Sequence, residues 1–254
     1  MGGCQLFAIG FGQAWCVTGA AGEKSGIHRT VLVALTSPSM HRLTLTEVEN
    51  RDELHDSKGT MSPETSGRLT VIKVGGGVAR IPGLLPRIGA AIAQAAKRHP
   101  LVVLPGGGDF ADQVREFDRA HSLSADASHW MAILAMDQYA FALADLIGGS
   151  RLVEDRPGML TAQAEGAVPV LAPARWLRAA DELPHSWEVT SDSLAAYLAT
   201  LLGAERLILV KPVAGGVELT DPWFLRTVPA GLRWSVLAGG EIDRLESLLA
   251  DQSS

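Results

Sequence analysis

Residues 71–77 read VIKVGGG, and residues 101–109 read LVVLPGGGD. In each stretch a short apolar strand runs directly into three glycines. Glycine allows left-handed backbone angles and leaves main-chain N–H groups uncovered, so such a loop can surround a negatively charged group. Lys73 stands two residues before the first loop and adds a positive charge there. Two loops of this kind in one chain predict an enzyme that handles phosphate.

Outward from these loops, strands and helices alternate from Arg68 onward. Apolar residues at helical or strand spacing, bounded by turn formers, define the elements. Helices are predicted at 84–95, 110–121, 125–147, 193–202 and 241–249, and strands at 69–74, 101–104, 151–153, 168–171 and 207–210, with 217–219 and 234–237 as further strands. The alternation predicts an α/β fold, a three-layer αβα sandwich around a mostly parallel sheet.

The first 67 residues differ from the rest. They lack the basic region and cleavage site of a secretory signal, and residues 47–67 are polar and rich in turn formers. Met61 lies just before the first clear strand. We therefore expect 1–67 to be a disordered or misassigned extension and 68–254 to form the domain. Both cysteines, Cys4 and Cys16, fall in the extension, so the domain is expected to have no disulfide and no cysteine-based zinc site.

The amino-acid composition limits the kinds of partner that this chain can bind. A formal net charge of -6 argues against non-specific nucleic-acid binding, which needs a basic face, but not against a small anion. The chain has no run of about 18 apolar residues, so no membrane span is predicted. We expect a cytoplasmic protein that acts on a small molecule.

The first loop, Gly75, Gly76 and Gly77, follows a strand end, where ligands of parallel sheets bind. Its N–H groups could hold phosphate oxygens, with Lys73 neutralising them. The alternative is a tight turn beside a solvated lysine. Neither a Walker A loop nor a Rossmann glycine pattern is present, and the acidic residue that binds ribose is missing, which argues against a dinucleotide-dependent oxidoreductase.

The second loop, Gly106, Gly107 and Gly108, could face an anionic substrate group. Asp109 after it would then contact substrate, or would simply cap the next helix. The carboxylate of Asp137 lies in an apolar helix and needs a partner, either a substrate ammonium or a group of the protein itself.

Residues 190–193 read TSDS and open a helix. They could be helix caps, or an anion site in which Asp192 orients lysines or a magnesium–phosphate complex. Lys211 ends the strand that follows, where it could reach a nucleotide; the alternative is a surface lysine.

The order strand–Lys-x-Gly-Gly-Gly, strand–Pro-Gly-Gly-Gly, Ser-Asp-x-x-Ala and strand–Val-x-Gly resembles the amino acid kinase superfamily from Arg68 to about Ala250. The resemblance implies a three-layer αβα fold in which residues 68–189 hold the phosphoryl acceptor and residues 190–250 hold ATP. It also implies Mg²⁺ as cofactor and a homo-oligomer, with no protein ligand assigned to a metal. Together with the residue patterns above, the resemblance gives Lys73, Asp192 and Lys211 as candidate catalytic residues; those for nucleotide and phosphate are Gly75, Gly76, Gly77, Ser191, Gly215 and Asp221; those for the acceptor are Gly106, Gly107, Gly108, Asp109 and Asp137.

Four segments, 129–140, 190–196, 209–213 and 220–222, are similar to the aminomethylfuran phosphate kinase branch of methanofuran and one-carbon metabolism. That similarity implies phosphorylation of 5-(aminomethyl)-3-furanmethanol phosphate by ATP. The chain departs from many members at Ala214, where they have Asp, and it lacks a lysine in a Gly-Gly-Met motif. Two alternatives remain: a kinase of the same fold for uridylate, isopentenyl phosphate or an amino acid, and a non-catalytic protein that binds nucleotide or oxyanion.

Overall fold

The computed structural model describes residues 5–9, 13–17, 33–34 and 69–251. The chain divides into two compact units, Met1–Met61 and Ser62–Ser254. In the first, β1 (Gln5–Ile9), β2 (Gln13–Val17) and β3 (Val33–Ala34) pair antiparallel in that order. Most of the expected extension at 1–67, Cys4 included, lies outside the described residues, so that expectation stays a prediction.

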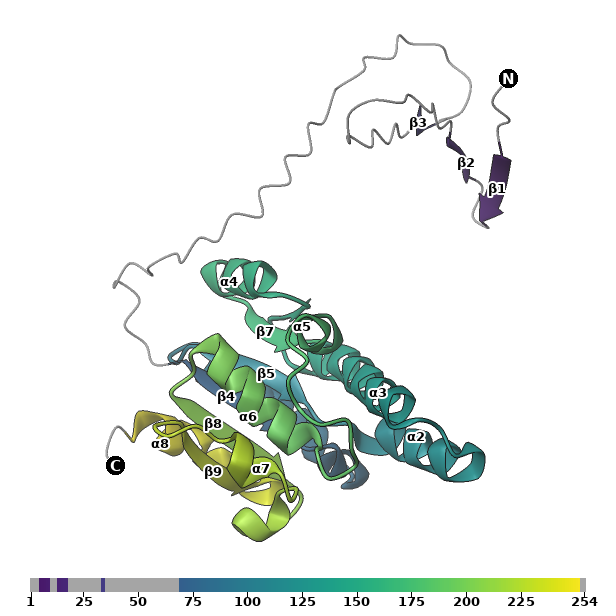
Figure 1. Ribbon diagram of the computed structural model, residues 1–254. Coiled ribbons are helices and arrows are strands. Elements are labelled where there is room, and N and C mark those ends of the chain that lie inside the picture. The colour runs from purple at the N-terminus through teal and green to yellow at the C-terminus, as the bar shows by residue number, and fades with distance from the viewer. Residues whose placement is uncertain (1–4, 10–12, 18–32, 35–68, 252–254) are drawn as a thin grey trace. The chain divides into compact units, whose positions relative to one another are not determined.

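The second unit is built on a six-stranded sheet in which every neighbouring pair is parallel (Figure 1). Its strands are β4 (Thr70–Val74), β5 (Leu101–Pro105), β6 (Ser150–Val153), β7 (Val168–Leu171), β8 (Arg206–Lys211) and β9 (Arg233–Ala238). They lie in the order β6-β7-β5-β4-β8-β9, so β4 is central and its neighbours are β5 and β8. The carboxyl ends of the two strands that lead into glycine loops are therefore adjacent.

Helices cover both faces of this sheet. They are α1 (Leu84–Ala95), α2 (Gly108–His121), α3 (Ala125–Leu146), α4 (Arg156–Ala164), α5 (Ala174–Ala179), α6 (Ser191–Leu202), α7 (Phe224–Thr227) and α8 (Leu245–Ala250), with 3-10 helices η1 (Gly76–Arg80), η2 (Val217–Leu219) and η3 (Gly239–Arg244). The α6 helix packs on one face with α4, α5 and α7, and α1 and α8 pack on the other. This arrangement confirms the predicted αβα sandwich.

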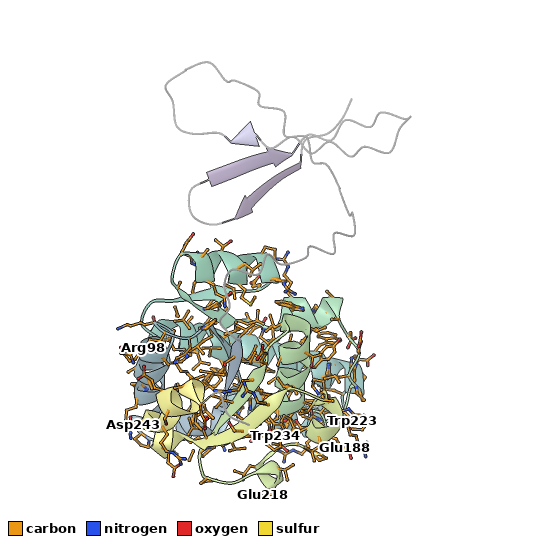
Figure 2. All side chains as sticks on the ribbon, turned by 90° about the vertical axis from the view of Figure 1, so that its left-hand side faces the viewer. Arg98, Glu188, Glu218, Trp223, Trp234 and Asp243 are labelled. Atoms are coloured by element: carbon orange, nitrogen blue, oxygen red, sulfur yellow. The ribbon has the colours of Figure 1, made fainter. Side chains whose placement is uncertain are left out.

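Strand alternation divides the core between the two faces. In β4, Val71 points to the α6 face, while Ile72 and Val74 point to the α1 face. In β8, Leu207 and Leu209 point to the α6 face. Successive side chains of a strand alternate, so Lys73 and Lys211 continue these two apolar rows toward α6. Side chains fill the space on both sides of the sheet, among them Trp234 of β9, which is labelled in Figure 2. On the α6 side the Phe224 ring meets the Trp234 ring edge-on, with 4.9 Å between the ring centroids.

The prediction of a strand at 217–219 is wrong. These residues form η2, held by local bonds from Leu219 N–H to the Gly216 carbonyl (3.1 Å) and from Thr220 N–H to the Val217 carbonyl (2.9 Å). Three residues between turns satisfy their backbone groups locally, without a neighbouring strand. The predicted closing helix at 241–249 is split into η3 and α8, and α4, α5 and α7 were not predicted. Among the described helices, none combines the length and apolar character needed to span a bilayer.

Candidate functional site

A cavity of about 470 Å³ opens near the carboxyl ends of β4 and β8, within the size range of small-molecule sites. It extends along α2 from Gly108 to Asp118, a stretch of eleven residues that is about 15 Å long. Eight of the site residues predicted from the sequence line this cavity: Lys73, Gly76, Gly77, Gly107, Gly108, Ser191, Asp192 and Lys211.

Asp192 joins the two lysines of the site. Its Oδ1 accepts a hydrogen bond from Lys73 Nζ at 2.8 Å, and its Oδ2 accepts one from Lys211 Nζ at 2.6 Å. Lys73 is 2% exposed and Asp192 is 3% exposed. The geometry follows from the fold, because both lysines end apolar rows beneath α6 and Asp192 lies in the first turn of α6.

This group of three carries two positive charges and one negative charge. Burial alone would raise the pKa of the Asp192 carboxyl, but the ammonium groups of Lys73 and Lys211 outweigh it and hold the pKa below its usual value. Burial and the nearby Lys73 lower the pKa of the Lys211 ammonium, and Asp192 offsets part of that effect. An anion in the cavity would supply the negative charge that the group lacks.

The two glycine loops lie against each other beside this group. A Cβ on Gly76 would fall 2.1 Å from the Gly108 Cα, and Gly108 has a left-handed φ of 57°, so both positions require glycine. The N–H groups of Gly75 and Gly106 donate to the carbonyls of Val210 (2.9 Å) and Val74 (2.8 Å). These two glycines therefore extend the strand pairing and are outside the cavity wall.

Three helix starts meet at the cavity. Gly76 and Gly77 open η1, Gly108 opens α2, and Ser191 opens α6. The first N–H groups of a helix have no intrahelical acceptor, and they carry the positive end of the helix dipole. The arrangement is suited to phosphate oxygens.

Asp221 holds the start of α6 in place. Its carboxylate accepts hydrogen bonds from Thr190 N–H (3.0 Å), Thr190 Oγ1 (2.8 Å), Ser193 N–H (3.0 Å) and Ser193 Oγ. It is outside the cavity wall. The structure thus places this predicted nucleotide-binding residue as a cap of α6, supplied from about 30 residues away in the chain.

Three other predicted residues are also outside the wall. Asp109 is exposed and ion-paired to Arg80, with 2.7 Å between its Oδ1 and Arg80 Nε. Asp137 Oδ1 accepts a hydrogen bond from Ala174 N–H at 3.0 Å at the start of α5, and burial raises the pKa of its carboxyl. Gly215 packs against Leu219.

Sequence reasoning missed a polar and aromatic part of the wall along α2. Arg115 Nη1 lies 3.0 Å from Asp112 Oδ1, and the Arg115 guanidinium lies over the Trp187 ring, 4.8 Å from its centroid. Trp187 Nε1 donates to Asp118 Oδ2 at 2.7 Å, a bond that lowers the pKa of Asp118. A spacing of three residues from Asp112 to Arg115 to Asp118 puts all three on one helix face, a signal visible in the sequence.

His129 on α3 also lines the cavity. Burial, together with the neighbouring His185, lowers the pKa of His129 to about 4. Hydrogen bonding to Asp181 raises the pKa of His185. His185 itself is outside the cavity wall, but the next two residues, Ser186 and Trp187, line the cavity.

Comparison with known proteins agrees with this geometry. The amino acid kinase family matches residues 68–215 of the chain. The chain belongs to the amino acid kinase family. The family's match begins two residues before β4 and includes both glycine loops, α6 and β8, so the resemblance drawn from the sequence motifs is confirmed.

One curated relative is 34% identical over 115 residues: the (5-(aminomethyl)furan-3-yl)methyl phosphate kinase of Methanocaldococcus jannaschii. The match covers 45% of this chain and 53% of that protein, so the chain spans about half the length of this relative. Among solved structures, the uridylate kinase of Archaeoglobus fulgidus is similar in fold, with a TM-score of 0.57 at 14% identity over 73% of this chain and 97% of that one.

Proposed function

We propose that this chain is a kinase that transfers the γ-phosphoryl group of ATP to a phosphate group on a small acceptor. The observation that carries the proposal is the buried group Lys73–Asp192–Lys211 in the wall of a cavity onto which helix starts converge. The excess positive charge of this group, together with the free N–H groups at the helix starts, suits two phosphorylated ligands better than a neutral substrate.

In the proposed reaction an oxygen of the acceptor phosphate forms a bond to the γ-phosphorus, and the bond from that phosphorus to the β,γ-bridging oxygen breaks. The products are ADP and an acceptor diphosphate. The acceptor phosphate is already ionised near neutral pH, so no strong general base is needed. Lys73 and Lys211 reduce the repulsion between the two anions and stabilise the charge on the transferring group, while Asp192 holds both lysines in position.

Magnesium needs oxygen ligands, and both oxygens of Asp192 are bound to ammonium groups. Asp192 therefore fits the role of orienting lysines and does not fit that of a magnesium ligand. Mg²⁺ would neutralise phosphate charge when it enters with ATP.

For the acceptor we propose (5-(aminomethyl)furan-3-yl)methyl phosphate, and with it a role in methanofuran-type cofactor biosynthesis. Support comes from the relative from Methanocaldococcus jannaschii and from the composition of the wall. This acceptor carries a phosphate, a flat ring and an ammonium group. The glycine loops suit the phosphate, the Trp187 ring suits the furan, and the ionised Asp118 suits the ammonium.

The test is a phosphorylation assay with the purified full chain, ATP, Mg²⁺ and this acceptor, followed by ³¹P NMR for the diphosphate product. Uridylate, isopentenyl phosphate and amino acids serve as competing acceptors. Diphosphate formation at the highest kcat/KM with the aminomethylfuran supports the proposal. Faster turnover of another acceptor would refute the proposed acceptor but support the proposed kinase activity. ATP binding without turnover of any acceptor would refute the kinase activity itself.

A further inference from the structure

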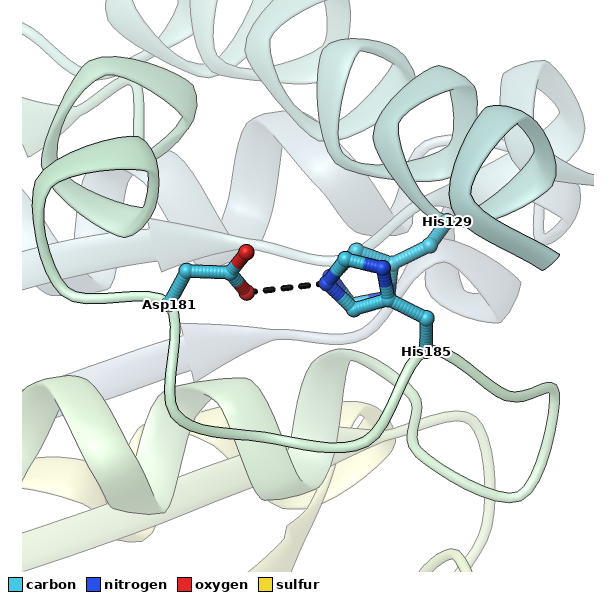
Figure 3. A group of neighbouring side chains, drawn as sticks. All are labelled: His129, Asp181 and His185. Atoms are coloured by element: carbon cyan, nitrogen blue, oxygen red, sulfur yellow. Dashed lines mark hydrogen bonds and ion pairs between the residues drawn. The ribbon is translucent and has the colours of Figure 1, made fainter.

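Figure 3 shows a cluster of two histidines and an aspartate, of which His129 lines the cavity. His129 comes from α3, and Asp181 and His185 come from the segment between α5 and α6. One ligand atom from each lies within 4.8 Å of the other two. The two imidazole rings are stacked, with centroids 4.0 Å apart and planes inclined by 14°, so one ring must turn about its Cβ–Cγ bond before nitrogens of both rings point at one ion.

Both ring nitrogens of His185 face carboxylates. Asp126 Oδ1 lies 2.6 Å from Nδ1, and Asp181 Oδ1 lies 2.9 Å from Nε2. A carboxylate on one imidazole nitrogen is the usual partner of a histidine whose other nitrogen binds a metal, because it fixes the tautomer and the ring orientation. Asp126 occupies that position, which leaves Nε2 directed at the oxygen of Asp181.

We infer that His129, Asp181 and His185 form a binding site for a divalent transition metal such as Zn²⁺, with Asp126 as the carboxylate that orients His185. Zinc accepts this combination of imidazole nitrogen and carboxylate oxygen, with a water molecule as fourth ligand. Metal–ligand bonds of about 2.0–2.2 Å place tetrahedral ligand atoms roughly 3.3 Å apart. The 2.9 Å between His185 Nε2 and Asp181 Oδ1 is already close to that spacing.

Charge supports the same assignment. Even with a proton on each nitrogen, His185 offsets only one of the two carboxylates that contact it. A divalent cation held by two neutral imidazoles offsets both. The Asp181 side chain is 37% exposed and that of Asp126 is 80% exposed, so an ion can enter from solvent.

The site would fix the segment before α6 against α3. Four of the five residues that follow His185 line the cavity: Ser186, Trp187, Val189 and Thr190. A metal bound by His185 and His129 would thus hold one wall of the cavity against another. This role is separate from the proposed phosphoryl transfer and does not depend on it.

The experiment measures Zn²⁺ binding by isothermal titration calorimetry on the full chain stripped of metal. Residues 1–61 contain two cysteines and three histidines, which can bind Zn²⁺ themselves, so the readout is the difference between variants. His185→Ala and His129→Ala should each lose one equivalent of bound Zn²⁺. The control, His121→Ala, removes an exposed histidine of α2 and should keep it.

Asp126→Asn gives a graded test that does not remove a ligand. Loss of an orienting carboxylate usually weakens metal binding 10- to 100-fold, and we expect that decrease at unchanged stoichiometry. Thermal melts without metal show whether each variant is folded. Equal Zn²⁺ stoichiometry and affinity in wild type, His185→Ala and Asp126→Asn would overturn the site and leave His185 as an imidazolium held by its two aspartates.

Discussion

Gly76 of the first glycine loop packs against Gly108 of the second so closely that a Cβ on Gly76 would lie 2.1 Å from the Gly108 Cα. The neighbouring atoms belong to the backbone and cannot rotate away. Glycine is therefore needed at Gly76 for contact between the two loops, in addition to any contact with phosphate. The position of one loop relative to the other depends on this contact.

Gly76→Ala should destabilise the protein by about 1–3 kcal/mol, the usual cost of overpacking. The measurement is the free energy of unfolding from urea denaturation. Gly148→Ala is the matched control, because a Cβ there meets no atom within 4 Å, and it should change stability by less than about 0.5 kcal/mol. If the two variants were equally stable, the close contact between the loops would be refuted.

Lys73→Met should lower kcat by about a hundredfold or more on the proposed acceptor, because it removes one preorganised positive charge from the transferring phosphoryl group. Methionine keeps most of the side-chain volume, so packing beneath α6 is retained. Lys97→Met is the control, since Lys97 is exposed near the end of α1 and contacts only Gln94 in the described hydrogen bonds. Near-normal turnover by Lys73→Met would remove Lys73 from the mechanism.

Asp192→Asn should destabilise the fold by on the order of 3–5 kcal/mol at neutral pH, because it leaves buried lysines without their anion. The lowered pKa of Asp192 fixes the sign of the pH dependence. The contribution is fully present above the unfolded-state value of about 3.9 and is lost as pH falls through the lower folded-state pKa. Urea denaturation of wild type and Asp192→Asn between about pH 7 and pH 3 gives the free energy of unfolding of each protein. The difference between the two free energies should shrink below about pH 4. A difference independent of pH would contradict this account.

From local patterns the sequence placed Lys73 and Lys211 at strand ends and Asp192 at the start of a helix, and the family resemblance implied that Asp192 orients the lysines. The structure brings the three side chains together because β4 and β8 are paired neighbours and α6 lies over the face to which both lysines point. The two glycine loops were predicted from their position directly after apolar strands. Within each loop, however, the sequence did not separate the N–H groups of Gly75 and Gly106, which pair with strands, from those left free.

Contacts between distant segments could not be predicted from local patterns. Asp221 lies next to a proline and a tryptophan in the chain, and nothing there indicates that it caps α6. Asp137 was correctly expected to need a partner, but Ala174 N–H, 37 residues away, is that partner in the structure. Asp118 was overlooked because its place in the cavity depends on Trp187, 69 residues later.

Binding of ATP or phosphate should be accompanied by proton uptake at alkaline pH. Burial and Lys73 lower the pKa of Lys211 in the free protein, so at alkaline pH a larger fraction of Lys211 is neutral than of a solvated lysine. An anion beside it stabilises the charged form and raises that pKa. Calorimetry at about pH 9 in buffers of different ionisation enthalpy measures the protons taken up. Lys211→Met should abolish the uptake, and equal uptake by that variant would assign the proton to another group.

Asp118→Asn should discriminate between acceptors by their amine. Asparagine keeps an oxygen that can accept the hydrogen bond from Trp187 Nε1, which lies 2.7 Å from Asp118 Oδ2, but its amide nitrogen replaces the Oδ1 that accepts from Leu123 N–H at 3.1 Å. The substitution therefore removes the negative charge together with that backbone bond, and an acceptor without the amine separates the two effects. For the aminomethylfuran phosphate we expect KM to rise by about ten- to a hundredfold, since a charge-assisted hydrogen bond contributes about 1.5–3 kcal/mol and about 1.4 kcal/mol is a factor of ten. For the analogue with a methyl group in place of the aminomethyl group, kcat and KM should be unchanged by the substitution. An equal rise in KM for both acceptors would mean that Asp118 acts on the shape of the wall and not on the ammonium group.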